Sequence, residues 1–171
     1  MLHGCTASSP STARTTPNAA QAAAWDGAEG AFWAANHHLF EAVLDRYQPA
    51  FERAAAIEPH HRVLDIGCGT GGYSRTAAAA AHGGHVLGID LSSRMIDVAR
   101  DLAARAGLRN IAFERADAQI HPFDTDHNVL VSQTGAMFFD DQDAAFTNLH
   151  HALRPGGRMV LLTWNHPEHQ Q

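Results

Sequence analysis

The stretch RVLDIGCGTGGY, residues 62–73, decides the fold of this 171-residue chain. A short apolar run, residues 62–66, leads directly into a glycine-rich segment, residues 67–72, and a helical pattern follows from Tyr73 to Ala81. Glycines permit a tight turn and let the backbone approach a ligand closely at the N-terminus of a helix. The stretch therefore predicts a strand, a ligand-binding loop and a helix in immediate succession.

Downstream of this stretch, short apolar runs alternate with helical patterns. The runs are HVLGI (85–89), NIAFER (110–115), NVLVS (128–132) and RMVLLTW (158–164), and the helical patterns cover residues 93–106 and 141–153. Near-continuous apolar strands joined by helices predict a parallel sheet that is covered on both faces. We expect an α/β fold, a Rossmann-like three-layer sandwich with a mainly parallel sheet, whose ligand lies beyond the carboxyl ends of the strands.

The chain upstream divides into two further parts. Residues 1–18 are rich in Ser, Thr, Pro and Gly and predict a disordered tail, and residues 19–57 predict an N-terminal helical cap on a core of residues 58–171. Within the cap, apolar residues at helical spacing predict one amphipathic helix that ends before Pro49, followed by a short helix through Ala56. The residues at this spacing are Phe32, Ala35, Leu39, Val43 and Tyr47.

Composition excludes several classes of function. All 12 basic residues are arginines, so the chain lacks the lysine of a P-loop, of a pyridoxal Schiff base or of a lysine nucleophile. A net charge of -6 without a basic cluster argues against nucleic acid as a partner. Neither an apolar run of membrane-spanning length nor a signal peptide is present, which predicts a cytoplasmic protein without membrane contact. Cys5 and Cys68 do not form a disulfide framework.

The glycine loop leaves two kinds of cofactor open. Gly67, Gly69 and Gly72 satisfy the GxGxxG pattern of dinucleotide-binding proteins, so a nicotinamide-dependent oxidoreductase is one alternative. Asp65, two residues before the first glycine, would repel a pyrophosphate and attract a cation. S-adenosylmethionine carries a sulfonium and an ammonium group and has no phosphate, so the acidic loop favours it.

Longer segments carry a family resemblance. VLDIGCGTGG resembles motif I of the class I S-adenosylmethionine-dependent methyltransferases, and the similarity continues through GIDLSSRMIDVAR, ADAQIHPF, VSQTGAMFFDD and ALRPGGRMVLLTW, over residues 20–165. These motifs and their spacing are similar to those of the small-molecule methyltransferases of the ubiquinone/menaquinone-biosynthesis-like group. The resemblance implies an enzyme that transfers a methyl group from S-adenosylmethionine to a small-molecule acceptor.

The resemblance also implies a set of cofactor-binding residues. Gly67 and Gly69 would line the methionine part of the cofactor, and Asp65 would lie near its amino group through water. Asp90 would accept hydrogen bonds from both ribose hydroxyls, or it could merely cap the helix that begins near Ser92. The remaining implied residues are Leu91 and Met95 near the adenine, Asp117 and Ala118 at its amino edge, and Ser132 beside the methyl group. Met95 could equally be a core residue, and Asp117 an ordinary loop acid.

Three departures from the family bear on activity. Gln133 stands where arginine is usual, Thr134 where an aromatic residue is usual, and His127-Asn128 where an acidic residue is usual. The family's sheet has seven strands, so this chain resembles a member truncated after the fifth strand. We expect strand 158–164 to be an open edge that promotes self-association. A non-catalytic, cofactor-binding remnant is therefore an alternative to an active enzyme.

The sequence selects neither a catalytic residue nor a metal site. His37, His38 or His121 could accept a proton, and nothing in the pattern distinguishes them. The histidine pairs 37/38, 60/61 and 150/151 point about 100° apart on a helix and cannot share one ion well. The loop residues His121, Asp124, Asp126 and His127 have metal-ligand chemistry, but their spacing defines no coordination geometry. Residues 154–157, RPGG, predict a type II turn with a structural role.

Overall fold

The computed structural model describes residues 18–165, and the predicted tail lies outside the described residues except for Asn18. The helices are α1 (Ala19–Trp25), α2 (Ala28–Ala35), α3 (His37–Asp45), α4 (Gln48–Ala55), α5 (Gly72–Ala80), α6 (Ser93–Arg105) and α7 (Gln142–Ala152), with a 3-10 turn, η1 (Ala136–Phe138). The strands are β1 (Arg62–Ile66), β2 (His85–Asp90), β3 (Ile111–Arg115), β4 (His127–Gln133) and β5 (Leu153–Leu162). No helix in this part of the chain combines the length and the apolar character that crossing a membrane requires.

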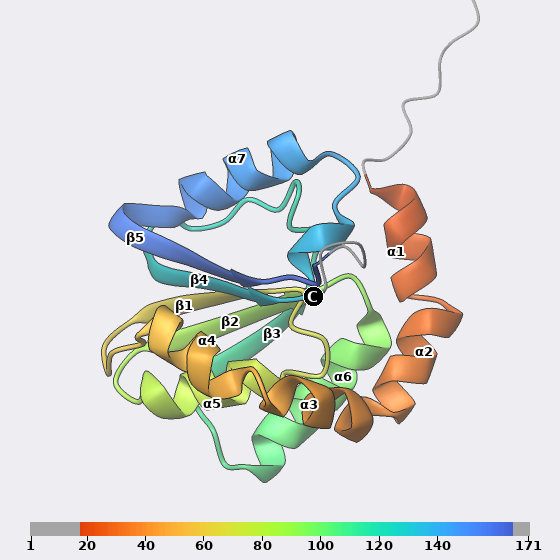
Figure 1. Cartoon of the computed structure of the whole chain (residues 1–171), viewed down its shortest axis with the longest axis horizontal. Helices are drawn as coiled ribbons and strands as arrows, with labels where there is room; N and C mark the ends of the chain where they lie inside the picture. The colour runs from red at the N-terminus through yellow and green to blue at the C-terminus, as the bar shows by residue number, and fades with distance from the viewer. Residues whose placement is uncertain (1–17, 166–171) are drawn as a thin grey trace, which may run out of the picture.

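The five strands form one parallel sheet in the order β3-β2-β1-β4-β5. Helix α5 connects β1 to β2, α6 connects β2 to β3, and α7 connects β4 to β5. Figure 1 shows α4, α5 and α6 on one face of the sheet and α7 on the other, while α1 and α2 lie beside the ends of the strands. The predicted α/β, Rossmann-like fold with a parallel sheet is therefore confirmed.

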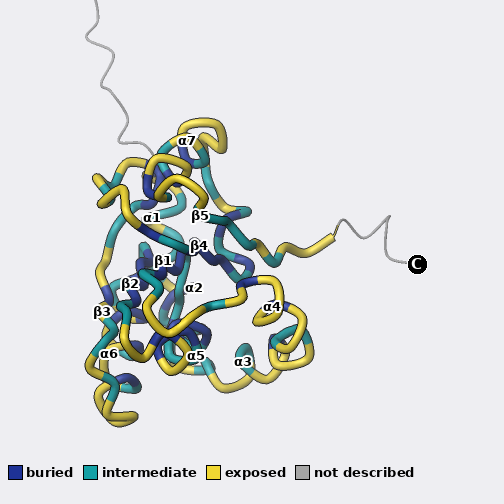
Figure 2. The backbone as a smooth tube through the Cα atoms, turned by 90° about the vertical axis from the view of Figure 1, so that its left-hand side faces the viewer, coloured by how far each residue is buried: buried dark blue, intermediate teal, exposed yellow. Residues whose placement is uncertain are grey.

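Alternating side chains of the central strands build a core on each face. Val63 and Val131 pack on the side of α4 and α5, where Phe51 and Tyr73 meet edge to face at 4.7 Å. Leu64 and Leu130 point to the opposite side and pack against α7. The central strands β1, β2 and β4 are mostly buried, whereas β3 and β5 at the edges are mostly exposed or intermediate (Figure 2). The apolar runs predicted strands correctly because a parallel sheet buries both of its faces.

The helical cap differs from its prediction. Instead of one helix from residue 32 to residue 47, α2 and α3 meet at Asn36, whose side-chain Nδ2 donates to the Phe32 carbonyl at 2.8 Å. A side-chain amide that satisfies a helix-end carbonyl competes with helix continuation. Phe32, Leu39 and Val43 are more than half exposed, so the predicted apolar stripe is not a buried face. The tail prediction also ends one residue late, because Asn18 is only 2% exposed.

Strand β5 lies at the edge of the sheet and pairs, among the described strands, with β4 alone. Its register jumps between His127 and Val129, where residues 154–157 loop out with Gly156 at φ 78°, the value that a type II turn requires at its third position. The strand ends at Leu162, two residues before its predicted end. Trp164 turns away from the strand and packs against Tyr47, with ring centroids 6.1 Å apart.

Candidate functional site

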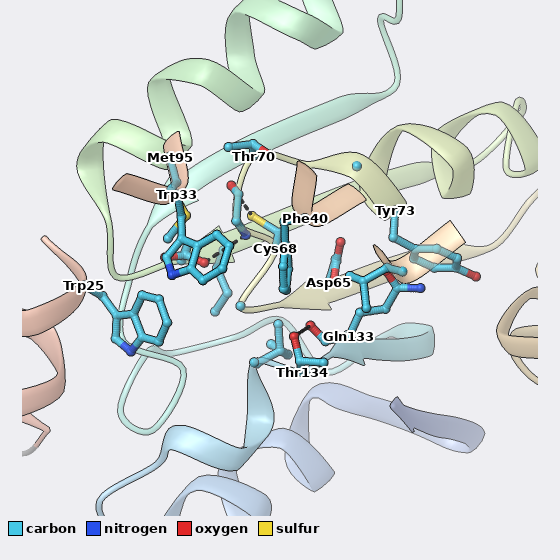
Figure 3. A pocket seen from close by; sticks show the side chains of 18 of the residues that line it. Trp25, Trp33, Phe40, Asp65, Cys68, Thr70, Tyr73, Met95, Gln133 and Thr134 are labelled. Atoms are coloured by element: carbon cyan, nitrogen blue, oxygen red, sulfur yellow. Dashed lines mark hydrogen bonds between the residues drawn. The ribbon is translucent and has the colours of Figure 1, made fainter. Parts of the chain in front are cut away.

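A cavity of about 480 Å³ lies at the carboxyl ends of the strands, where the fold predicts a ligand. Its walls come from the segments that follow each of the five strands and from the N-terminal helices. Trp25 and Trp33 enter from the helices, and Gln133 and Thr134 enter from the end of β4 (Figure 3). The volume is within the range of small-molecule and cofactor sites.

The glycine loop leaves room on its cavity side. Gly67 has φ 64°, and a Cβ at this position would lie 2.8 Å from the Gly135 Cα, so both conformation and space require glycine. Gly69 has φ 54°, and a Cβ there would meet only the Met95 sulfur, at 3.8 Å. Gly69 lines the cavity, and the space beside its Cα is open.

Asp65 is a buried carboxyl at the bottom of the cavity. It is 2% exposed, and the Ser74 hydroxyl donates to its Oδ2 at 2.5 Å. Burial raises the pKa of Asp65 to about 7, the nearby Asp90 carboxylate adds to the increase, and the Ser74 hydrogen bond opposes it. A cation bound beside Asp65 would favour its ionised form.

Asp90 ties the glycine loop to the end of β2. Its Oδ2 accepts from the Gly69 amide and its Oδ1 accepts from the Ser92 amide, both at 2.9 Å. Burial raises the pKa of Asp90, and these backbone hydrogen bonds oppose the increase. The N-cap of α6 is Ser92, whose Oγ accepts from the Met95 amide at 3.4 Å, so Asp90 is not the helix cap.

The loop after β3 contributes Asp117 and Ala118 to the cavity wall. The Asp117 Oδ1 accepts from the Asn18 side chain at 3.1 Å and from the Gln119 amide at 3.0 Å. The structure brings eight of the nine predicted cofactor residues to one cavity. They are Asp65, Gly67, Gly69, Asp90, Leu91, Met95, Asp117 and Ala118.

Ser132 is the predicted residue that does not reach the cavity wall. It is fully buried, and its hydroxyl donates to the Ile66 carbonyl at 2.7 Å and accepts from the Ala136 amide at 3.0 Å. Gln133 and Thr134 occupy the wall instead. Thr134 has φ 62°, a left-handed conformation that is strained for a β-branched residue. Strain of this kind is typical of functional sites.

Aromatic residues of the N-terminal helices are the part of the site that the sequence reasoning missed. Trp33 and Phe40 line the cavity with ring centroids 5.0 Å apart, and Trp25 packs edge to face on Phe138 at 5.1 Å. Figure 3 shows Trp25, Trp33 and Phe40 opposite the glycine loop. Their signal in the sequence was the density of aromatic residues between positions 25 and 40.

The structure distinguishes the three candidate proton acceptors. Only His37 lines the cavity; His38 is exposed, and His121 lines a smaller cavity formed with Arg62 and Glu114. The His37 Nδ1 is buried, lies 3.9 Å from the Glu41 carboxylate and makes no hydrogen bond with a described residue.

Glu41 connects this histidine to the glycine loop. The Arg75 Nη2 donates to the Glu41 Oε1 at 3.0 Å, and the Arg75 Nη1 donates to the Thr70 carbonyl at 2.8 Å. Both side chains of the ion pair are largely shielded from solvent. Helix α3 is thereby fixed against the loop that the sequence predicted as the ligand-binding element.

The acidic loop considered for a metal has another explanation. Arg62 forms ion pairs with Asp126 at 2.9 Å and with Asp124 at 3.4 Å, and the His127 Nδ1 lies 3.1 Å from the Ala152 carbonyl. Within residues 18–165, no three His, Cys, Asp or Glu side chains gather as a metal site.

The charge of the cavity determines what it can hold. Five carboxyl groups line it, against one arginine, and that arginine is paired with Glu41. The five are Glu41, Asp45, Asp65, Asp90 and Asp117. Such a wall repels a pyrophosphate and suits a positively charged ligand without phosphate. S-adenosylmethionine therefore fits the residues present better than a nicotinamide dinucleotide does.

Comparisons with known proteins agree with this geometry. Residues 63–157 match the family model described as a methyltransferase domain. An uncharacterised protein of Mycobacterium tuberculosis is 34% identical over 137 residues, which cover 78% of this chain and 49% of that protein. The ubiquinone/menaquinone biosynthesis C-methyltransferase UbiE of Cellvibrio japonicus is 33% identical over 120 residues, 68% of this chain and 48% of the relative. The chain thus spans about half the length of these curated relatives.

A solved structure extends the comparison to the fold. Phosphoethanolamine N-methyltransferase 2 of Haemonchus contortus, solved with phosphomonomethylethanolamine and S-adenosylhomocysteine, is 28% identical and superposes with a TM-score of 0.63. The match covers 68% of this chain and 27% of that enzyme.

Proposed function

The chain belongs to the class I S-adenosylmethionine-dependent methyltransferases, and on this premise we propose that it binds S-adenosylmethionine in the cavity and transfers its methyl group to a small-molecule acceptor. The observation that carries the proposal is the acidic, phosphate-repelling wall around an open glycine loop. Family membership implies the cofactor, and the wall gives the physical reason for it.

We assign each part of the cofactor to residues that line the cavity. Gly67 and Gly69 line the methionine chain, and Asp65 holds its amino group through water. Each Asp90 oxygen already accepts one backbone hydrogen bond and retains a lone pair for a ribose hydroxyl. Leu91 and Met95 pack on the adenine, and Asp117 and Ala118 meet its amino edge.

The acceptor side of the cavity is proposed to be the aromatic wall. Trp33, Phe40 and Tyr73 line the cavity together with the glycine loop (Figure 3). Aromatic faces bind planar or apolar bodies, which supports an acceptor with a flat or apolar skeleton. When bound, the cofactor supplies an electrophilic methyl group. The protein's part is to orient the acceptor and to exclude water around it.

We propose His37 as the group that takes the acceptor's proton where the acceptor loses one. Its Nδ1 lies 3.9 Å from the Glu41 carboxylate, which is held in turn by Arg75. Gln133 and Thr134, which depart from the family pattern, form the opposite wall.

Calorimetric titration tests the proposal with S-adenosylmethionine, S-adenosylhomocysteine and NAD. We expect heat of binding from the first two and none from NAD. Binding of NAD alone would contradict the proposal and favour the oxidoreductase. Release of S-adenosylhomocysteine across a panel of planar acceptors then separates a methyltransferase from a protein that binds the cofactor without turnover.

A further inference from the structure

Asn18 is a buried polar side chain whose hydrogen-bonding capacity is half used. It precedes α1, is only 2% exposed and lines the cavity. Its Nδ2 donates to the Asp117 Oδ1 at 3.1 Å, whereas its Oδ1 is buried and accepts no hydrogen bond from a described residue. A buried amide oxygen without a partner costs free energy, so the position calls for a donor from the cavity.

The orientation of the Asn18 amide follows from its neighbour. Rotating the amide by 180° would place its oxygen against the Asp117 carboxylate, where two acceptors repel each other. The amide nitrogen therefore faces Asp117, and the oxygen is left for another group. On Asp117, the Oδ1 is saturated by the Asn18 and Gln119 donors, and no described residue donates to the Oδ2.

Two free acceptors thus lie on neighbouring side chains in one wall of the cavity. An exocyclic amino group of a purine carries two N–H donors, and a 6-oxo group carries none. We propose that Asn18 and Asp117 together read the 6-amino group of the cofactor's adenine, with Asn18 accepting one hydrogen through Oδ1 and Asp117 the other through Oδ2. This inference rests on the proposed binding of S-adenosylmethionine and adds an N-terminal residue to its base-recognition site.

Helix α1 supports this assignment by a second contact on the same side. Asn18 immediately precedes α1 and Trp25 is the last residue of α1, and both line the cavity. Trp25 lines the cavity and packs edge to face on Phe138, which lines it too. The segment before the sheet thereby provides both a hydrogen-bonding group for the edge of a purine base, Asn18, and an aromatic surface for its face, Trp25.

The test compares two nucleosides in two proteins by calorimetry on the full 171-residue chain. The ligands are S-adenosylhomocysteine and S-inosylhomocysteine, which has a 6-oxo group in place of the 6-amino group. The variant is Asn18→Gly, because Asn18 has φ 59° and glycine keeps this backbone conformation while removing the amide. The control is Gln142→Ala, which removes an exposed amide outside the cavity wall.

We expect Asn18→Gly to weaken S-adenosylhomocysteine binding about threefold to tenfold, the effect of one lost hydrogen bond. Binding of S-inosylhomocysteine should be unchanged or stronger, since its oxygen no longer faces an acceptor. The Gln142→Ala control should bind both ligands as the parent protein does.

Two results would overturn the inference alone: an equal loss for both nucleosides, which would make Asn18 only a tether for Asp117, or no loss for either. If the unaltered chain failed to bind S-adenosylhomocysteine, the proposed function itself would fall as well. The two failures are therefore distinguishable.

Discussion

Replacing Asp65 by Asn should remove the pH dependence that this buried carboxyl confers on stability. In the folded protein the pKa of Asp65 is raised to about 7, against 3.8 for an ordinary Asp side chain, chiefly because burial disfavours the charged form. Between these two values the folded chain holds a proton that the unfolded chain has released. The free energy of unfolding therefore falls as pH rises through this window.

The size of the effect follows from the shift. At about 1.4 kcal/mol per pKa unit, the difference corresponds to about 4 kcal/mol between pH 4 and pH 7. Asn has the same shape and cannot ionise, and its amide oxygen can still accept the hydrogen bond from the Ser74 hydroxyl. The variant should therefore be more stable than the parent above pH 7, and the difference should disappear toward pH 4.

Urea unfolding of both proteins at pH 5, 6, 7 and 8, without ligand, measures this difference directly. Other titrating groups are common to the two chains, so they cancel when the two curves are subtracted. Parallel pH profiles would refute the reasoning, because they would show that Asp65 titrates as an exposed carboxyl does. Titration with S-adenosylhomocysteine gives a second readout: its affinity should rise between pH 6 and pH 7 in the parent and stay constant in Asp65→Asn.

Three further predictions concern the loop, the helical cap and the sheet edge. Asp90→Asn should lower the free energy of unfolding by about 1 to 3 kcal/mol, because an amide nitrogen would face the Gly69 or Ser92 backbone donor. The variant should also bind S-adenosylhomocysteine more weakly. Unchanged denaturation and unchanged affinity would contradict the roles of Asp90 in the loop and in cofactor binding. Asp26→Ala removes hydrogen bonds from the Ser93 amide and hydroxyl and an ion pair with Arg115, so hydrogen exchange of residues 19–25 should become faster while that of β1 stays the same. Strand β5 is an edge strand among the described residues, so the 171-residue chain should associate through it, and Leu161→Lys should shift the chain toward monomer in sedimentation velocity because charge protects edge strands. A parent that stays monomeric at high concentration would contradict this prediction.

Local patterns predicted most of the fold. The strands were readable because a parallel sheet buries both faces, which produces short apolar runs, and the glycine loop was readable because Gly67 and Gly69 need positive φ. The break at Asn36 was missed because a side-chain amide that bonds the Phe32 carbonyl leaves no signature in hydrophobic periodicity.

The prediction placed the site at the correct ends of the strands, but it did not assign correctly which side chains of a strand point into the cavity. Successive side chains of a strand point to opposite faces, so a shift of one residue moved the predicted wall from Gln133 to Ser132, which is fully buried. Asn18 and Trp33 were missed for another reason: their place in the cavity depends on how the N-terminal helices dock, which is a long-range property of the fold.

That docking depends on contacts that also build the cavity. Helices α1 and α2 bury no apolar side chain, and α3 buries only Leu44. They are attached by Asn18 to Asp117 at 3.1 Å, by Asp26 to Arg115 at 2.9 Å and by Glu41 to Arg75 at 3.0 Å. Asp117 and Arg75 line the cavity themselves, and Arg115 directly precedes the loop, residues 116–118, that lines it. Because little apolar burial holds these helices, a ligand that contacts both walls stabilises their docked position by its own binding free energy. We therefore expect cofactor binding and docking of the N-terminal helices to be coupled, with Asn18 contributing to both.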